Sequence, residues 1–234
     1  MWLALERGMN ANLEARTVNT RRLDMQLRAR GIADRWVLAA MIAVPRERFV
    51  PAALADDAYT DRALPIACGQ SMKNPHLLAM MLESLRVETS DRVLEIGTGT
   101  GYSAAVLSVI AGEVFTIERL PLLASAARER LAALHYDRVT VGCSDGSLGW
   151  AEHAPFQGIL VTATGPRIPI SLREQLAIGG RLVMSVLRDG IATLAQVTRV
   201  DHDHYETTFS CAVELVPLIG EEGWPDDSDI MCTD

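Results

Sequence analysis

The fold of this chain is indicated most strongly by residues 93–102, Val-Leu-Glu-Ile-Gly-Thr-Gly-Thr-Gly-Tyr. An apolar run that contains Glu95 is followed by a glycine-rich turn, and the small residues after Tyr102 show helical spacing. We therefore expect a strand, a tight loop and the N-terminus of a helix. In this arrangement the backbone can approach a ligand closely.

The details of the loop limit which ligand it can hold. A dinucleotide loop has the pattern G-x-G-x-x-G, whose third glycine lets helix and strand pack around a pyrophosphate. Tyr102 occupies that last position here, and no Gly-Lys-Ser/Thr follows that would indicate a triphosphate loop. A carboxylate before the glycines repels pyrophosphate but suits a cofactor with an amine and a sulfonium. The loop thus predicts an S-adenosylmethionine site that includes Glu95, Gly97, Thr98 and Gly99.

From residue 91 onward, predicted strands and helices alternate, which is typical of an α/β protein with a parallel sheet covered on both faces. The predicted strands are 93–96, 113–117, 139–142, 157–162 and 180–186, with antiparallel closing strands at 192–200 and 207–217. The predicted helices between them are 102–111, 120–134 and 170–176. Before this region we expect helices at 12–30, 34–42 and 76–85, with Asp34 as an N-cap, and a loop over 58–75.

The composition excludes several classes of protein. The chain has 234 residues, 49% of them hydrophobic, enough for one well-buried domain but hardly for two. A net charge of −8 argues against a broad nucleic-acid surface. The four cysteines lack C-x-x-C spacing and the histidines show no metal spacing beyond His202-x-His204, so no metal is expected. With no signal-peptide leader and no membrane-length apolar run, we expect a cytoplasmic protein.

Polar residues follow the next strands in series. Glu118 ends the second strand, where an α/β nucleotide site binds ribose hydroxyls, although it is also close to a helix start. Asp145 follows the third strand and is placed to accept a hydrogen bond from an adenine amine, although Asp-Gly alone is a common turn. Thr162 ends the fourth strand. Because ligands of open sheets bind at the carboxyl edge, the series predicts one adenosine site there.

Many segments together carry a resemblance to a known family, the protein-L-isoaspartate O-methyltransferases, over roughly residues 40 to 224. The similar segments are 44–51, 59–66, 69–70, 93–102, 114–119, 146–150, 154–156, 161–163, 175–176, 179–183 and 216–218. The resemblance implies a Rossmann-like fold, S-adenosylmethionine as donor, and methylation of isoaspartyl α-carboxylates for repair of damaged proteins. It also implies a methyltransferase domain over 46–224, between an N-terminal helical extension (1–45) and an acidic flexible tail (225–234).

The resemblance adds further site residues. Cofactor contacts are implied for Gln70, Ser71, Asn74, Arg119 and Gly146. Ser71 to Asn74 are expected to form the wall between donor and acceptor, and the segment 216–218 to close over it. The partner is a protein or peptide with an isoaspartyl residue, and the chain is expected to be a monomer or homodimer.

One departure from the family lies in this wall. After Gly69-Gln70 the family usually reads Thr-Ile-Ser, and the serine is assigned to the active site. This chain reads Ser71-Met72-Lys73, so its only lysine stands at the serine position. Ser71 and Lys73 are therefore the candidate catalytic residues.

A lysine is a poor replacement if it binds the reacting oxygens. The acceptor carboxylate is already ionised at neutral pH, so no general base is needed. Its charge and that of the sulfonium cancel during transfer, so a cation on it stabilises the ground state more than the transition state.

Three interpretations of Lys73 stay open. It points away while Ser71 orients the acceptor, it binds a different carboxylate, or the acceptor has changed to a peptide aspartate or a small molecule. A non-catalytic cofactor-binding protein is the alternative from another class.

Overall fold

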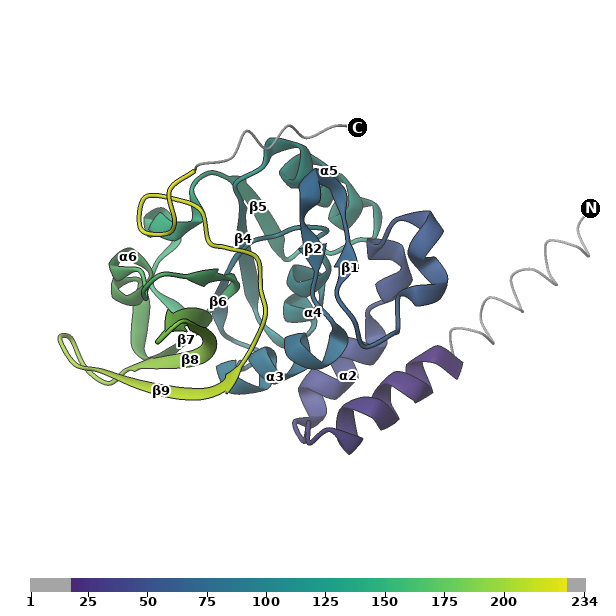
Figure 1. The fold of residues 1–234 in the computed structure, drawn as a ribbon, viewed down its shortest axis with the longest axis horizontal. Helices are drawn as coiled ribbons and strands as arrows, with labels where there is room; N and C mark the ends of the chain where they lie inside the picture. The colour runs from purple at the N-terminus through teal and green to yellow at the C-terminus, as the bar shows by residue number, and fades with distance from the viewer. Residues whose placement is uncertain (1–17, 227–234) are drawn as a thin grey trace, which may run out of the picture.

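The computed structural model describes residues 18–226 (Figure 1). Among these residues, seven strands form one sheet in the order β5-β4-β3-β6-β7-β8-β9. Their bounds are β3 (Arg92–Ile96), β4 (Glu113–Glu118), β5 (Val139–Cys143), β6 (Phe156–Gly165), β7 (Leu176–Arg188), β8 (Ile191–Arg199) and β9 (Tyr205–Ala212). The strands from β5 to β7 are parallel, and β8 and β9 continue the sheet antiparallel. The predicted α/β class, with a mostly parallel sheet and antiparallel C-terminal strands, is confirmed.

Helices cover both faces of this sheet. Their bounds are α2 (Arg35–Ala43), α3 (Pro75–Leu85), α4 (Tyr102–Ile110), α5 (Pro121–Ala133) and α6 (Ile170–Glu174). Val93 packs in a core with α2, α3 and α4, whereas its neighbour Leu94 packs in a second core that includes Leu172 of α6. Successive strand residues point to opposite faces, so strands that are apolar at every position require cover on both sides.

The N-terminal helices belong to the first of these cores. Residues 18–29 are helical, and Leu23 and Leu27 are buried in the same cluster as α2 and α4. Asp34 caps α2 as predicted, because its Oδ1 accepts the N–H of Trp36 at 2.8 Å and that of Val37 at 3.2 Å. Residues 12–17 of the predicted helix lie outside the described residues, as does most of the predicted acidic tail.

The expected loop over residues 58–75 is wrong in part. There β1 (Leu64–Pro65) pairs antiparallel with β2 (Ser71–Met72), and a 3-10 turn, Ala67–Gly69, connects them. Two-residue strands are too short to produce an alternating pattern, so the sequence gives no signal for them. This small hairpin forms one wall of the cavity described below.

The last predicted strand, 207–217, is also too long. β9 ends at Ala212, and the chain then leaves β9 and passes β6, as Figure 1 shows in yellow. The Thr164 N–H donates to the Val216 carbonyl at 2.7 Å, and the Leu218 N–H donates to the Thr164 carbonyl at 2.8 Å. These bonds place the segment 216–218 at the carboxyl edge of the parallel strands.

Candidate active site

A cavity of about 480 Å³ lies at the carboxyl edge of the sheet, where the strand order changes direction between β3 and β6. Its lining comes from the glycine turn after β3, the β1–β2 hairpin, the ends of β4 and β6, the turn after β5, and the C-terminal segment. Of the predicted site residues, the cavity is lined by Gln70, Ser71, Lys73, Gly97, Thr98, Gly99, Glu118, Arg119, Gly146 and Thr162. Asn74, Glu95 and Asp145 do not line it.

The glycine turn is held by β4 and β6. The N–H groups of Gly97 and Thr98 donate to the Ile117 carbonyl at 2.8 and 3.3 Å. Thr162 Oγ1 donates to the carbonyls of Ile96 and Gly97, at 3.0 and 2.9 Å. Gly97 has φ 92°, and a Cβ there would overlap Thr162 Oγ1. Only glycine therefore permits this turn to pack so closely on β6.

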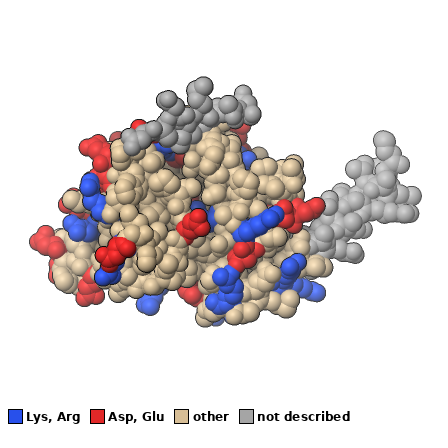
Figure 2. Space-filling model, viewed as in Figure 1, with Lys and Arg blue, Asp and Glu red and all other residues tan. Residues whose placement is uncertain are grey.

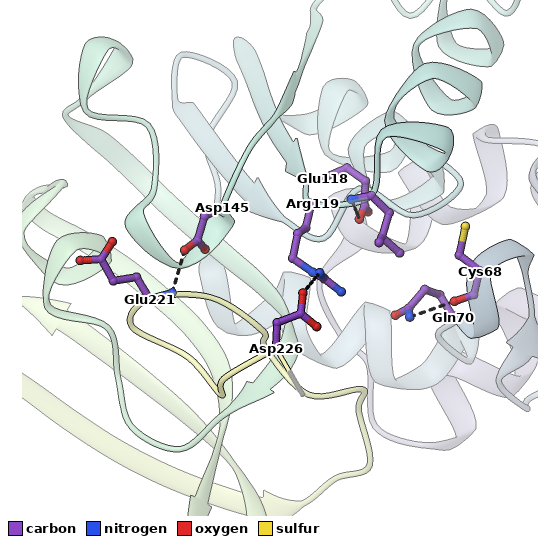
Figure 3. Close-up of polar contacts among 8 residues, drawn as sticks. Cys68, Gln70, Glu118, Arg119, Asp145, Glu221 and Asp226 are labelled. Carbon is purple, nitrogen blue, oxygen red and sulfur yellow. Dashed lines mark hydrogen bonds and ion pairs between the residues drawn. The ribbon is translucent and has the colours of Figure 1, made fainter. Parts of the chain in front are cut away.

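Glu118 braces the same turn from β4. Its Oε2 accepts the Gly99 N–H at 2.8 Å. Its Oε1, on the Glu118 side chain labelled in Figure 3, accepts the Leu120 N–H at 3.1 Å. The sequence suggests that Glu118 either stabilises the start of the next helix or binds the ribose of a ligand. The two roles are compatible, because one side chain can serve both. Each carboxylate oxygen keeps a second lone pair for a ligand hydroxyl.

Asp145 is engaged by the protein itself. Its Oδ1 accepts the N–H and the hydroxyl of Ser147, at 2.8 and 2.7 Å, and its Oδ2 accepts the Glu221 N–H at 2.7 Å (Figure 3). The neighbouring Gly146, rather than Asp145, faces the cavity. The adenine contact that the sequence suggests for Asp145 remains a prediction, and it competes with these three donors.

An ion pair lies beside Glu118 near the cavity. Arg119 Nη1 contacts Asp226 Oδ2 at 2.7 Å, and both side chains are partly exposed (Figure 3). Arg119 and Pro225 both line the cavity, so this pair ties the end of the described chain to the cavity wall.

The hairpin wall presents Gln70, Ser71, Met72 and Lys73 to the cavity. Asn74 instead caps α3, because its Oδ1 accepts the Leu77 N–H at 2.7 Å. The Asn74 amide NH2 is a separate donor group, so the cofactor contact that the resemblance implies for this residue stays a prediction.

The pKa values of Lys73 and Glu95 are both shifted by burial. Lys73 is half-buried by surface area because it faces the cavity, but its ammonium lies deep in the protein, and burial lowers its pKa to about 8. Glu95 has no exposed surface, and burial raises its pKa to about 7, against the opposing attraction of Lys73. For each of these two groups, the charge of the other is the largest influence that favours its ionised form.

Sequence reasoning assigned no role to Arg46, which lies behind this wall without exposed surface. Its Nε donates to the Ala58 carbonyl at 2.6 Å and its Nη2 to the Lys73 carbonyl at 2.5 Å, with the guanidinium over the Tyr102 ring. Arg46 therefore fixes the backbone of Lys73. An arginine between Pro45 and Phe49 looks like surface in the sequence, and only its place within a similar family segment singles it out.

No group of His, Cys, Asp and Glu among residues 18–226 could hold a metal ion. Within the same range, no helix is both long enough and apolar enough to cross a bilayer.

The fold and the cavity define the class: an α/β protein with the Rossmann-like methyltransferase fold. A solved protein-L-isoaspartate O-methyltransferase shares it with a TM-score of 0.79 and 26% identity, covering 87% of this chain and 67% of that one. A Plasmodium falciparum structure, described as a beta-aspartate methyltransferase in complex with S-adenosyl-L-homocysteine, has a TM-score of 0.74 at 22% identity, with 85% and 97% covered, and supports the fold alone.

The sequence comparisons specify the family within that class. The family described as Protein-L-isoaspartate(D-aspartate) O-methyltransferase matches residues 18–223. Protein-L-isoaspartate O-methyltransferase 2 of Marinobacter nauticus is 50% identical over 201 residues, 86% of this chain and 92% of that protein. The Protochlamydia amoebophila protein-L-isoaspartate O-methyltransferase is also 50% identical, over 86% of this chain and 97% of its own length. This chain belongs to the protein-L-isoaspartate O-methyltransferase family.

Proposed function

We propose that this protein transfers a methyl group from S-adenosylmethionine to the free α-carboxylate of isoaspartyl residues in damaged proteins, as a repair enzyme. The observation that carries the proposal is one cavity, shared by the glycine turn 97–99 and the wall 70–73, in a chain about 50% identical to named isoaspartate methyltransferases. Its volume is within the range typical of sites for small ligands and cofactors.

The residues present fit the donor. Glu118 is available to the ribose hydroxyls and the backbone of the glycine turn to the methionyl part, and Gly146 lines the same cavity after β5. Ile117, Leu120 and Leu123 add an apolar surface for the base. When bound, S-adenosylmethionine supplies an electrophilic methyl group on a sulfonium.

The chain's own residues then have to orient the acceptor and exclude water, since the carboxylate needs no base. Ser71 offers a neutral hydroxyl on the wall, and Met72, Val216 and Leu218 form apolar surface around the same cavity. Excluding water strengthens the electrostatic interactions inside the site.

The test is methyl incorporation by the purified full chain into an isoaspartyl peptide and its aspartyl counterpart. Selective methylation of the isoaspartyl peptide supports the proposal. Methylation of the aspartyl peptide instead would show that the acceptor has changed. This outcome is included because Lys73 stands where the family usually has serine. Donor binding without turnover on either peptide would identify a non-catalytic cofactor-binding protein.

The proposal extends to partners and location. We propose a cytoplasmic enzyme that acts on protein substrates rather than nucleic acid, as a monomer or homodimer. Figure 2 shows acidic and basic side chains interspersed over one face, without a broad basic surface among the described residues there. The division into an extension (1–45), a methyltransferase domain (46–224) and a tail (225–234) is likewise proposed.

A further inference from the structure

Arg46 is a fully buried cation whose hydrogen bonds go to the backbone and not to a carboxylate. Its Nε donates to the Ala58 carbonyl at 2.6 Å and its Nη2 to the Lys73 carbonyl at 2.5 Å. None of the ion pairs among residues 18–226 includes Arg46, and its Nη1 has no hydrogen-bond partner in that range. Burying a cation without a counter-ion is costly, so these backbone contacts need an explanation beyond charge pairing.

The groups that Arg46 contacts belong to three segments that are far apart in the sequence. Ala58 lies in the loop before β1, Lys73 directly follows β2, and Tyr102 begins α4 directly after the glycine turn. The Arg46 guanidinium carbon lies 4.7 Å from the centroid of the Tyr102 ring, and Phe49 packs edge-on against the same ring at 5.5 Å. Lys73 and Tyr102 both line the cavity, whereas Arg46 does not. Arg46 therefore joins the hairpin wall to the helix of the glycine turn from behind the cavity.

The hairpin wall and the glycine turn also meet at a second, weaker contact. There the Thr100 hydroxyl donates to the Met72 sulfur at 3.5 Å. A thioether sulfur is a weak acceptor, whereas a guanidinium presents its N–H donors in a rigid plane. Arg46 is therefore the stronger of these two links between the wall and the turn.

We propose that Arg46 is a positioning residue for methyl transfer, which holds the hairpin wall at a fixed distance from the glycine turn. This inference rests on the proposed function, in which the donor lies on the turn and Ser71 of the wall orients the acceptor. In that reaction an acceptor oxygen lone pair forms the new O–CH3 bond while the electrons of the S–CH3 bond stay on sulfur, which leaves a methyl ester and S-adenosylhomocysteine. The oxygen has to lie close to the methyl carbon and in line with the sulfur, and a displacement of about 1 Å can lower the rate about 100-fold.

Two substitutions of Arg46 test the positioning role, with donor and isoaspartyl peptide both saturating. Arg46→Met fills much of the space but donates no hydrogen bond, and we expect the single-turnover rate constant to fall about 100-fold. Arg46→Lys keeps the charge but cannot hold two carbonyls with one planar group, and we expect a fall of about tenfold. The Kd of S-adenosylhomocysteine and the KM of the peptide should stay within about threefold of the wild type. Arg48→Met is the matched control, because Arg48 is in the same turn but exposed, and it should keep the wild-type rate.

The split between rate and binding separates positioning from a loss of folded protein. The binding stoichiometry of S-adenosylhomocysteine gives the folded fraction of each variant, and each rate constant is expressed per binding site. A full rate for Arg46→Lys, or a loss of rate that weaker binding or fewer sites accounts for, would overturn the proposal. Where Arg46→Met does not fold, Arg46→Lys decides the question by the same measures.

A measurement without turnover separates this inference from the proposed function. We expect hydrogen exchange of the backbone amides of residues 70–74 to quicken severalfold in Arg46→Lys, but not in Arg48→Met, because the wall loses its link to α4. Unchanged exchange would overturn the role of Arg46 and leave the proposed function intact. If the wild type methylates no isoaspartyl peptide, the proposed function fails, and the exchange experiment still decides whether Arg46 holds the wall.

Discussion

The Asp145 carboxylate accepts the backbone N–H of Glu221 at 2.7 Å across 76 residues of sequence (Figure 3). The same carboxylate also binds Ser147, whose hydroxyl accepts the Glu222 N–H at 3.0 Å. This cluster fastens the C-terminal segment, which supplies the cavity residues Val216 and Leu218, to the end of β5. Asp145 therefore determines where one wall of the cavity stands.

Asp145→Ala removes an acceptor for three hydrogen bonds. We expect the free energy of unfolding to fall by about 1–3 kcal/mol, since the two partly buried donors of Ser147 and the exposed N–H of Glu221 lose their acceptor. We also expect S-adenosylhomocysteine affinity to weaken as the C-terminal wall loosens. Asp145→Asn is the matched control, because its carbonyl oxygen can keep either the Ser147 or the Glu221 contacts. Its stability and donor affinity should lie between those of the wild type and those of Asp145→Ala. Denaturant unfolding and calorimetric titration with S-adenosylhomocysteine measure both quantities. An Asp145→Ala protein with wild-type stability and affinity would refute the role.

Gly97→Ala should be among the most damaging single-methyl additions in the chain. The new Cβ meets Thr162 Oγ1 and sits at φ 92°, so we expect a loss of stability of about 1–3 kcal/mol and weak donor binding. Gly179→Ala is the control, because Gly179 also has a left-handed φ, 81°, but nothing lies within 4 Å of its Cβ position. Equal losses for the two variants would show that backbone strain alone, and not the contact with β6, explains the glycine.

Arg119→Ala should change donor binding more than stability. The Arg119–Asp226 pair is partly exposed, and such pairs contribute about 0–1 kcal/mol to stability. Because the pair ties the chain end to the cavity wall, we expect donor dissociation to quicken severalfold. Asp226→Ala should do the same, and raising the salt concentration should reduce the difference from the wild type. Stopped-flow displacement measures the rate. Unchanged dissociation rates in both variants would show that the Arg119–Asp226 pair does not retain the donor.

The burial of Glu95 and of Lys73 predicts a minimum in stability between two pH ranges. The raised pKa of Glu95, about 7 against an ordinary 4.5, stabilises the fold at low pH, and that stability is lost as pH rises toward 7. The lowered pKa of Lys73, about 8 against 10.5, contributes stability at high pH that is lost as pH falls toward 8. Wild-type Tm should therefore be lowest near pH 7–8, measured relative to the double variant Glu95→Gln/Lys73→Met. A constant Tm difference across pH 4.5–10.5 would contradict this account.

Much of the fold could be predicted from local pattern. The apolar run at 93–96, the glycine turn and the Asp34 cap each follow from chemistry within a few residues, and each is present. The row of Gly97, Glu118 and Thr162 along one edge follows from parallel strands, which bring their carboxyl ends together.

What sequence reasoning missed depends on contacts between distant segments. The Asp145–Glu221 bond and the Arg46–Lys73 bond have no periodic signature, because each joins segments far apart in the sequence that only the folded chain brings together. Polar side chains at strand ends predict a binding site at the edge of the sheet. They do not show whether each side-chain oxygen accepts hydrogen bonds from a ligand or from the protein itself. The three-dimensional structure supplies that distinction for Asp145 and Asn74.

The central claim is that this chain transfers the methyl group of S-adenosylmethionine to isoaspartyl carboxylates. The most direct measurement is the initial rate of methyl ester formation on two peptides that differ only in an isoaspartyl or aspartyl linkage. The account predicts a preference for the isoaspartyl peptide of about 100-fold or more in kcat/KM. Equal rates on the two peptides, or a faster rate on the aspartyl peptide, would contradict it.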